Sequence, residues 1–323
     1  MRAIAGTLHP HQLARFRANA ASLWPTNARL GIAVSGGPDS LALLLLAHAA
    51  RPDMIEAASV DHGLRAESAS ECEAVAAICE RLSVAHTILR VEVPQGNLQE
   101  NARDARYSAL CDWMQATGLS YLATAHHADD QAETLLMRLN RASGLSGLSA
   151  IRTSRSLVVG DGAESARLIR PLLGWRKAEL EAIVSAAGLE PVRDPSNRDP
   201  QFDRVRMRDA LTDADWLDPL SIAASAGHLS EALEGLEWAA EREWEVQVEA
   251  TESEIAYAPV APRAVQLMVL ERAFKQLGGM PRGGAIAALR DRLAGGEGGN
   301  LAGILVSIEG KSWRLRREPP RRH

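Results

Sequence analysis

The residues most able to do chemistry form a short loop, Ser35-Gly36-Gly37-Pro38-Asp39-Ser40, between an apolar stretch at 30–34 and an aliphatic stretch at 41–50. Two glycines allow a sharp turn from a strand into a helix, and they let consecutive backbone N–H groups approach a ligand. Because a helix N-terminus attracts anions, the loop predicts a phosphate site in which the Ser35 and Ser40 hydroxyls are further donors. Asp39 would repel a phosphate unless a divalent cation lay between them, so it predicts a Mg²⁺ ligand. An ordinary turn with Pro38 at the first helical position is the alternative that the loop alone leaves open.

Two other polar stretches follow predicted strands. Asp61-His62 comes directly after 55–60, and His126-His127-Ala128-Asp129-Asp130 comes after 119–125. Strands predicted at 30–34, 55–60, 84–91 and 119–125 alternate with helical stretches, which indicates an α/β fold with a parallel sheet covered on both faces. Ligands of such sheets bind beyond the carboxyl ends of the strands. We therefore expect the loop and both polar stretches to meet at one edge of the sheet.

Charged side chains within two of the helices are candidates for the same site. Asp130 and Glu133 lie three residues apart on a predicted helix and so share a face, where they could hold a cationic substrate or accept a proton from an amine. A capping box at the helix start explains the same spacing. Arg103 and Arg106 lie on successive turns of another helix and could neutralise a phosphate, although surface pairs with Glu100 or Asp104 are the ordinary alternative.

Length and composition limit the classes of protein. The chain has 323 residues, 46% of them hydrophobic, and a net charge of −5, so we expect a globular protein of two domains with no strongly basic surface overall. The sequence has no apolar stretch near the roughly 20 residues of a membrane span, and its three cysteines form no CxxC pair or zinc spacing. A cytoplasmic location and no membrane partner follow as expectations. A change of composition near Trp216 predicts a catalytic domain at 1–216 and a smaller, mainly helical C-terminal domain at 217–323.

The loop is not a Walker A loop, because the required lysine is absent. It resembles the Ser-Gly-Gly-x-Asp-Ser PP-loop of the N-type ATP pyrophosphatases, which implies that ATP is a substrate, that AMP is transferred and that pyrophosphate is released. The resemblance implies an adenine nucleotide alpha hydrolase-like fold. The residues that it assigns to ATP are Ser35, Gly36, Gly37, Pro38, Asp39, Ser40, Asp61 and His62, with Asp39 also holding Mg²⁺.

With its later motifs the chain resembles the tRNA(Ile)-lysidine synthase family from about Leu30 to Arg208. The matching blocks are Ser35 to Ser40, Asp61 to Arg65 with Glu67-Ser68, Glu100 to Tyr107, Thr124 to Gln131 with Glu133-Thr134, Arg138 to Gly147, Arg170 to Leu173, and Asp194 to Asn197. The resemblance implies attack of the wobble cytidine of a CAU-anticodon tRNA(Ile) on ATP, followed by displacement of AMP at C2 by free L-lysine. It assigns catalysis to Asp39, Arg106, Asp130 and Glu133, and lysine binding to Asp130 and Glu133; Arg103 is the alternative to Arg106.

The basic segment that follows is the predicted contact with tRNA. Arg204, Arg206 and Arg208 occupy the place of the family's basic segment, although Val205 stands where a polar residue is expected. The resemblance also implies that the C-terminal domain contacts tRNA, and a homodimer is possible. Other PP-loop reactions, such as tRNA thiolation or an amidotransferase-type synthesis, and a non-catalytic tRNA-binding protein are the competing hypotheses. Clustered cysteines or a glutaminase nucleophile would favour the first two, and loss of Asp39, Asp130 or Glu133 would favour the third.

Overall fold

The structure is a computed structural model that describes residues 8–64, 67–159, 164–192, 201, 203–281 and 283–318. The chain divides into two compact units, residues 1–230 and 231–323, and the division falls within the long helix α9 (Pro219–Gln247). The PP-loop and all the predicted site residues belong to the first unit. The predicted Asp194–Asn197 motif lies outside the described residues.

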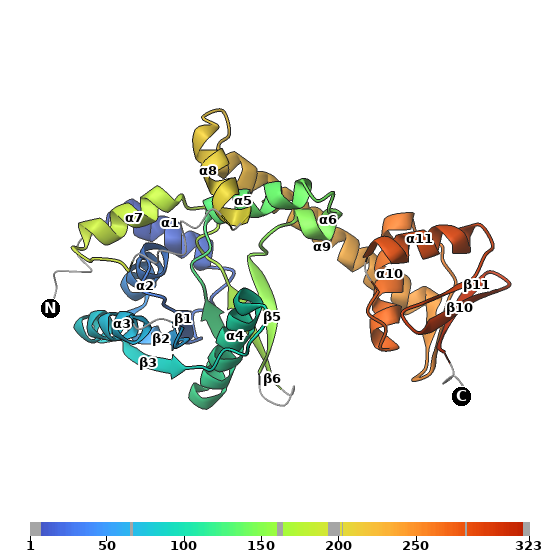
Figure 1. Cartoon of the computed structure of the whole chain (residues 1–323), viewed down its shortest axis with the longest axis horizontal. Coiled ribbons are helices and arrows are strands. Elements are labelled where there is room, and N and C mark those ends of the chain that lie inside the picture. The colour runs from blue at the N-terminus through green and yellow to red at the C-terminus, as the bar shows by residue number, and fades with distance from the viewer. Residues whose placement is uncertain are drawn as a thin grey trace. The chain divides into compact units, whose positions relative to one another are not determined.

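The first unit is built on a sheet in which six strands are described, in the order β3-β2-β1-β4-β6-β5 (Figure 1). Every neighbouring pair is parallel except β5 with β6, which form an antiparallel hairpin. The strands are β1 (Leu30–Ala33), β2 (Ile55–Asp61), β3 (Ala85–Arg90), β4 (Tyr121–Ala123), β5 (Ser154–Val159) and β6 (Glu164–Ile169). The predicted α/β class and the four parallel strands are thus confirmed.

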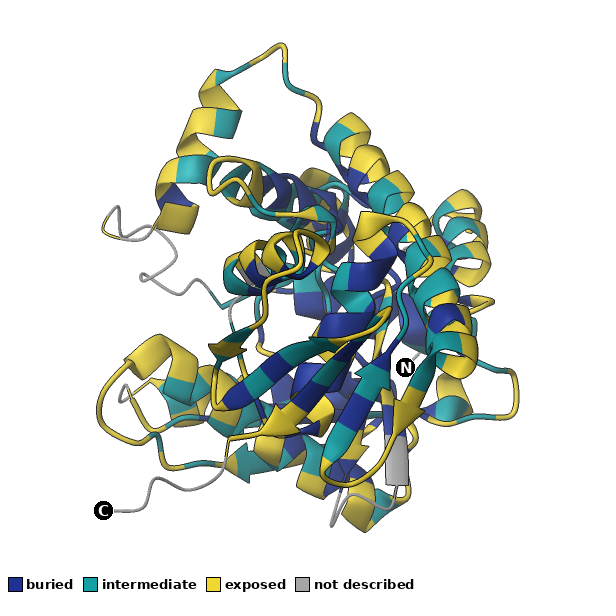
Figure 2. Cartoon of the chain, turned by 90° about the vertical axis from the view of Figure 1, so that its right-hand side faces the viewer, coloured by how far each residue is buried: buried dark blue, intermediate teal, exposed yellow. Residues whose placement is uncertain are grey.

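Helices cover both faces of this sheet because successive strand side chains point to opposite sides. Ile169 belongs to the core formed with α1 (Pro10–Ala20), α2 (Pro38–Ala50), α3 (Ser68–Leu82) and α7 (Lys177–Ala186), whereas neighbouring Leu168 packs against α4 (Leu98–Thr117). Gly31 of β1 lets α4 approach closely, since a Cβ there would lie 2.8 Å from the Trp113 ring. Figure 2 shows the buried residues on the strands and on the inward helix faces.

The first unit also contains the 3₁₀ turn Pro52–Met54 and the helices α5 (Ala128–Leu139), α6 (Leu145–Leu148) and α8 (Asp203–Asp213). Helix α5 follows β4 directly and contacts both α6 and α8. It begins at Ala128, so Asp129 and Asp130 both lie in its first turn. Among the described helices of the whole chain, none is long and apolar enough to cross a membrane.

The second unit combines helices with an antiparallel sheet. Helices α10 (Arg263–Gln276) and α11 (Gly283–Ala294) share a core with the sheet, whose described strands run in the order β7-β8-β11-β10-β9. Strands β10 (Ile304–Glu309) and β11 (Ser312–Arg317) form an antiparallel pair. Strands β7 (Val248–Ala250), β8 (Glu254–Tyr257) and β9 (Gly299–Leu301) were not predicted, because three- or four-residue strands depend on pairing rather than on local propensity.

Candidate active site

The PP-loop lies at the point where the order of the sheet reverses. From β1 the chain goes to β2 and β3 on one side, and β4 lies on the other side of β1. In open α/β sheets this switch point forms the ligand crevice beyond the carboxyl ends of the strands. The PP-loop after β1 and the His126–Asp130 stretch after β4 therefore face the same crevice, as predicted, and Asp61-His62 follows the adjacent β2.

Hydrogen bonds within the PP-loop hold its backbone in place. The Ser35 N–H donates to Ser40 Oγ (3.1 Å), and Ser40 Oγ donates to the Gly37 carbonyl (3.0 Å). Gly36 has φ +80°, and a Cβ there would lie 2.9 Å from Val192 Cγ2, so both conformation and space require glycine. Gly37 has an ordinary extended conformation (φ −70°), so its lack of a side chain matters only for the approach of a ligand. With Pro38 at the first helical position, the helix N-terminus stays open to an anion.

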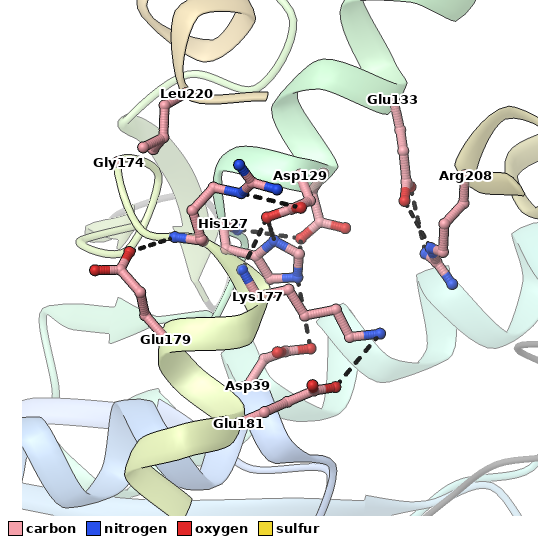
Figure 3. Close-up of polar contacts among 12 residues, drawn as sticks. Asp39, His127, Asp129, Glu133, Gly174, Lys177, Glu179, Glu181, Arg208 and Leu220 are labelled. Carbon is pink, nitrogen blue, oxygen red and sulfur yellow. Dashed lines mark hydrogen bonds and ion pairs between the residues drawn. The ribbon is translucent and has the colours of Figure 1, made fainter. Parts of the chain in front are cut away.

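His127 lies among three carboxylates that come from two different elements (Figure 3). Its Nε2 is 3.6 Å from Asp39 Oδ2 and 3.5 Å from Asp130 Oδ2, and its Nδ1 is 3.5 Å from Asp129 Oδ2. Burial alone would lower the pKa of His127, but Asp129, Asp39 and Asp130 raise it to about 10. A buried imidazolium therefore links the PP-loop helix to α5. From the sequence, His127 could orient a leaving group or be structural, and its link to three carboxylates was not predicted, although acidic neighbours at 129 and 130 were the available signal.

The three carboxylates around His127 have different partners. Asp130 accepts the backbone N–H of His127 (3.1 Å), while its other oxygen meets Arg204 Nη2 at 3.2 Å. The capping box of α5 is thus formed by His127 and Asp130, and not by Asp130 and Glu133 as the alternative interpretation had it. Asp129 accepts the backbone N–H of Lys177 (2.8 Å), and its pKa is about 2, because His127, that N–H and Arg176 outweigh burial. Asp39 Oδ1 is buried without a hydrogen-bond partner among the described residues.

The unpaired Asp39 Oδ1 shows whether the residues of this site fit the predicted Mg²⁺. Among the described residues, no group of three His, Cys, Asp or Glu side chains could hold a metal alone. Mg²⁺ in nucleotide sites is usually held by one or two carboxylates together with substrate phosphates, so it needs no such group. An unpaired Asp39 oxygen at the PP-loop fits that mode of binding.

Glu133 is fully enclosed and paired with two arginines of α8. Its side chain is 2% exposed; Oε1 accepts Arg208 Nε at 2.7 Å, and Oε2 accepts Arg204 Nε at 2.8 Å. Arg204 and Arg208 are four residues apart and share a helix face, whereas Arg206 lies on another face, is 65% exposed and pairs with Asp203. Of the three predicted RNA-binding arginines, the structure thus brings two to the predicted lysine-binding carboxylate and leaves one outward. Val205, the unexpected residue, is buried.

The predicted phosphate ligand Arg106 lies within electrostatic reach of two histidines at the crevice. Burial, then Arg106, lowers the pKa of His62. His126 hydrogen-bonds Thr124 Oγ1 through Nδ1 (3.0 Å), and burial together with Arg170, Arg204 and Arg106 holds its pKa at about 3 despite Asp130. His126 is therefore neutral, in contrast to its cationic neighbour.

Asp61 has a local structural role in addition to its predicted contact with ATP. One oxygen accepts the Ser68 hydroxyl (2.6 Å) and the Gly63 N–H (3.0 Å), and these bonds lower the pKa of Asp61. They fix the turn after β2 at the edge of the crevice. A contact between Asp61 and ATP remains a prediction.

A pocket of about 400 Å³ opens beside Glu133. It is lined by charged groups of both signs, Asp129, Glu133, Arg176 and Arg208, and by residues between Leu211 and Pro219, at the end of α8 and the start of α9. This volume lies in the usual range for small-molecule sites. The pocket suits a small ligand that carries both a cation and an anion.

The crevice, the PP-loop and the adjacent charged pocket define a nucleotide-binding enzyme of the PP-loop class, and comparison with known families agrees. The PP-loop domain family matches residues 9–215. The chain is 48% identical to the tRNA(Ile)-lysidine synthase of Novosphingobium aromaticivorans, over 95% of this chain and 94% of that protein. It is 38% identical to the one of Zymomonas mobilis, over 92% and 91%. The chain belongs to the tRNA(Ile)-lysidine synthase family, and it is a ligase-type enzyme that uses ATP.

A solved structure with a similar fold is the U34-tRNA thiolase NcsA from Methanococcus maripaludis, with its [4Fe-4S] cluster. The TM-score is 0.59 at 18% identity, over 69% of this chain and 78% of that one. At this identity the likeness shows a shared fold alone. In this chain Cys72 and Cys79 are buried free thiols and Cys111 is partly buried.

Proposed function

We propose that this protein joins free L-lysine to C2 of the wobble cytidine of tRNA(Ile) with a CAU anticodon, through an adenylated cytidine, releasing pyrophosphate and AMP. The single observation that supports this best is the position of His127, which links Asp39 of the PP-loop helix to Asp130 of α5. The groups that we propose to bind the nucleotide and the amine thus lie at one crevice. The names of the family members and the PP-loop domain support the same reaction.

The first half-reaction needs a bound triphosphate and a stabilised α-phosphate. Backbone N–H groups of the PP-loop and the N-terminus of α2 provide donors for the phosphates, and Asp39 Oδ1 is free to bind Mg²⁺. Bound Mg²⁺ would neutralise the triphosphate and assist departure of pyrophosphate. The cytidine O2 attacks the α-phosphorus, and Arg106 stabilises the charge that develops there.

The second half-reaction needs a lysine whose ε-amine has lost its proton. An unperturbed lysine amine has a pKa near 10.4, so it arrives as a cation that a carboxylate can bind and then deprotonate. Asp130 and Glu133 carry that negative charge, while Arg176 and Arg208 can meet the carboxylate of the amino acid in the adjoining pocket. The arginines that pair with Glu133 occupy the place of a substrate cation, so we expect lysine to displace at least one of them. The amine then attacks C2, and AMP leaves with the O2 atom.

A reconstituted reaction tests the proposal directly. The protein is incubated with ATP, Mg²⁺, labelled lysine and a CAU-anticodon tRNA(Ile), and the digested RNA is examined for lysine-modified cytidine. Parallel reactions omit Mg²⁺ or replace the anticodon cytidine by uridine, and neither should incorporate label. If tRNA and ATP bind but lysine is never incorporated, the proposal is wrong; sulfur incorporation would instead support the thiolation alternative.

Two further predictions belong to this proposal. We expect the enzyme to act in the cytoplasm, where tRNA, ATP and free lysine are available. A homodimer remains a prediction, and analytical ultracentrifugation of the full chain would test it.

A further inference from the structure

An arginine cluster surrounds Tyr107 on α4, next to the crevice but outside the groups used above, with the exception of Arg106. The guanidinium carbons of Arg103, Arg106 and Arg155 lie 5.2, 5.4 and 4.8 Å from the centre of the Tyr107 ring. Contacts of this kind orient a guanidinium while leaving its N–H groups free. The three arginines thus present preordered donors around one aromatic ring.

Arg170 adds a fourth guanidinium close to Tyr107. It is 5% exposed, its Nη1 donates to the Arg152 carbonyl (2.6 Å), and its Nε is buried without a hydrogen-bond partner among the described residues. Burial lowers the pKa of Arg170, Tyr107 raises it, and Arg155 and Arg103 lower it, so these groups lie within electrostatic reach of one another. A buried donor without a partner needs an acceptor from outside these residues, and a phosphate oxygen can supply it.

The positive charge of the cluster is not neutralised within the described part of the chain. None of the four arginines forms an ion pair there, whereas Arg204 and Arg208 on the other side of the crevice are paired with carboxylates. Four cations held together without a counter-ion repel one another, and bound anions would remove that repulsion. Arginine forks match phosphate oxygens in geometry as well as charge.

The position of the cluster in the fold indicates whether the bound phosphates belong to a nucleoside triphosphate or to a polynucleotide. Arg170 directly follows β6, and Arg155 lies beside Leu168 at the start of antiparallel β5, so both are at the carboxyl edge of the parallel strands. At about 4.8 Å per strand, β5 is roughly 14 Å from β1, where the PP-loop begins. A triphosphate held at the PP-loop does not extend along the sheet to Arg155. A polynucleotide, which carries a phosphate on every residue, can follow that path.

We propose that Arg103, Arg155 and Arg170 around Tyr107 form a track for RNA backbone phosphates that leads to the nucleotide held at the crevice, where Arg106 meets the α-phosphate. This inference rests on the proposed function in taking the RNA to be tRNA. Arg106, which the proposed function assigns to the α-phosphate, lies between the track and the crevice, within electrostatic reach of His62 and His126. Arg103 and Arg155 are exposed and form its outer part, where they would bind phosphates without reading the base sequence.

The experiment measures binding of full-length wild-type protein and variants to unmodified tRNA by fluorescence anisotropy, at several KCl concentrations and without ATP. Arg103→Gln and Arg155→Gln change exposed side chains and should leave the fold intact. We expect each to weaken tRNA binding by about tenfold at low salt and to reduce the slope of log K against log [KCl] by about 0.7–0.9. Arg81→Gln is the matched control. Arg81 is exposed and lies in the last turn of α3, at the end of that helix opposite the crevice, so this variant should bind tRNA like the wild type.

ATP binding by the same variants identifies the source of the phosphate. Unchanged ATP affinity together with weaker tRNA binding supports the track. Weaker ATP binding with unchanged tRNA binding would assign the cluster to the nucleotide, and variants that bind both ligands like Arg81→Gln would also overturn the proposal. The variants could show the expected loss of tRNA binding while the wild-type protein never incorporates lysine. That result would refute the proposed function but would still support the track.

Discussion

Replacing Glu133 by glutamine tests the division of the crevice into two halves. Glu133 is almost completely enclosed and receives charge-assisted hydrogen bonds from Arg204 and Arg208, which are themselves 44% and 34% exposed. Such bonds contribute about 1.5–3 kcal/mol in protected surroundings, and exposure of the arginines reduces that contribution. We therefore expect Glu133→Gln to lower the free energy of unfolding by about 2 kcal/mol. If removal of the Glu133 charge weakens its interaction with the lysine ammonium by a similar free energy, lysine should be used roughly thirtyfold less well.

The assay follows the two half-reactions separately. Pyrophosphate release from ATP with tRNA in the absence of lysine reports adenylation, and label incorporation at varied lysine concentration reports the second step. Glu133→Gln should change the first rate by only a few fold while raising the KM for lysine by about thirtyfold. Glu56→Gln is the matched control, because this largely buried carboxylate pairs with Arg29 near the start of β2, at the opposite edge of the sheet. Equal losses in both steps would show that Glu133 only supports the structure.

Three further predictions concern the metal, the core and pH. Asp39→Asn should abolish pyrophosphate release at any Mg²⁺ concentration, measured on protein whose circular dichroism is unchanged; activity restored by excess Mg²⁺ would instead indicate only weakened affinity. Gly31→Ala should destabilise the protein by about 1–3 kcal/mol in urea unfolding, because its Cβ would overlap the Trp113 ring, and a variant as stable as wild type would contradict that close contact. His126, with a pKa of about 3, stays neutral in the folded protein while the unfolded chain takes up a proton below about pH 6.5. The free energy of unfolding should therefore decrease as the pH is lowered from 6.5 to 4.5, and His126 should contribute up to about 1.4 kcal/mol per pH unit to that decrease. His126→Asn should make this pH dependence shallower.

Motifs that follow strands were predicted well because their meaning depends on local pattern. Ser35–Ser40, Asp61-His62 and His126–Asp130 each follow a strand, and a parallel sheet places all such segments at one edge. Pairings between distant segments were not predictable in the same way. The interpretation of Arg204 and Arg208 as free RNA contacts did not anticipate Glu133, about seventy residues earlier, as their partner in the structure.

The sequence by itself determined the α/β class, the phosphate loop and the carboxylates of α5, because glycine spacing, strand alternation and helical periodicity are local properties of the chain. Only the tertiary structure decided which of these groups meet. The order of β1 and β4 in the sheet brings Asp39 beside His127, and the packing of α8 on α5 brings two arginines to Glu133. Burial among charges then makes His127 a cation and keeps His126 neutral, a difference that two identical adjacent residues cannot encode locally.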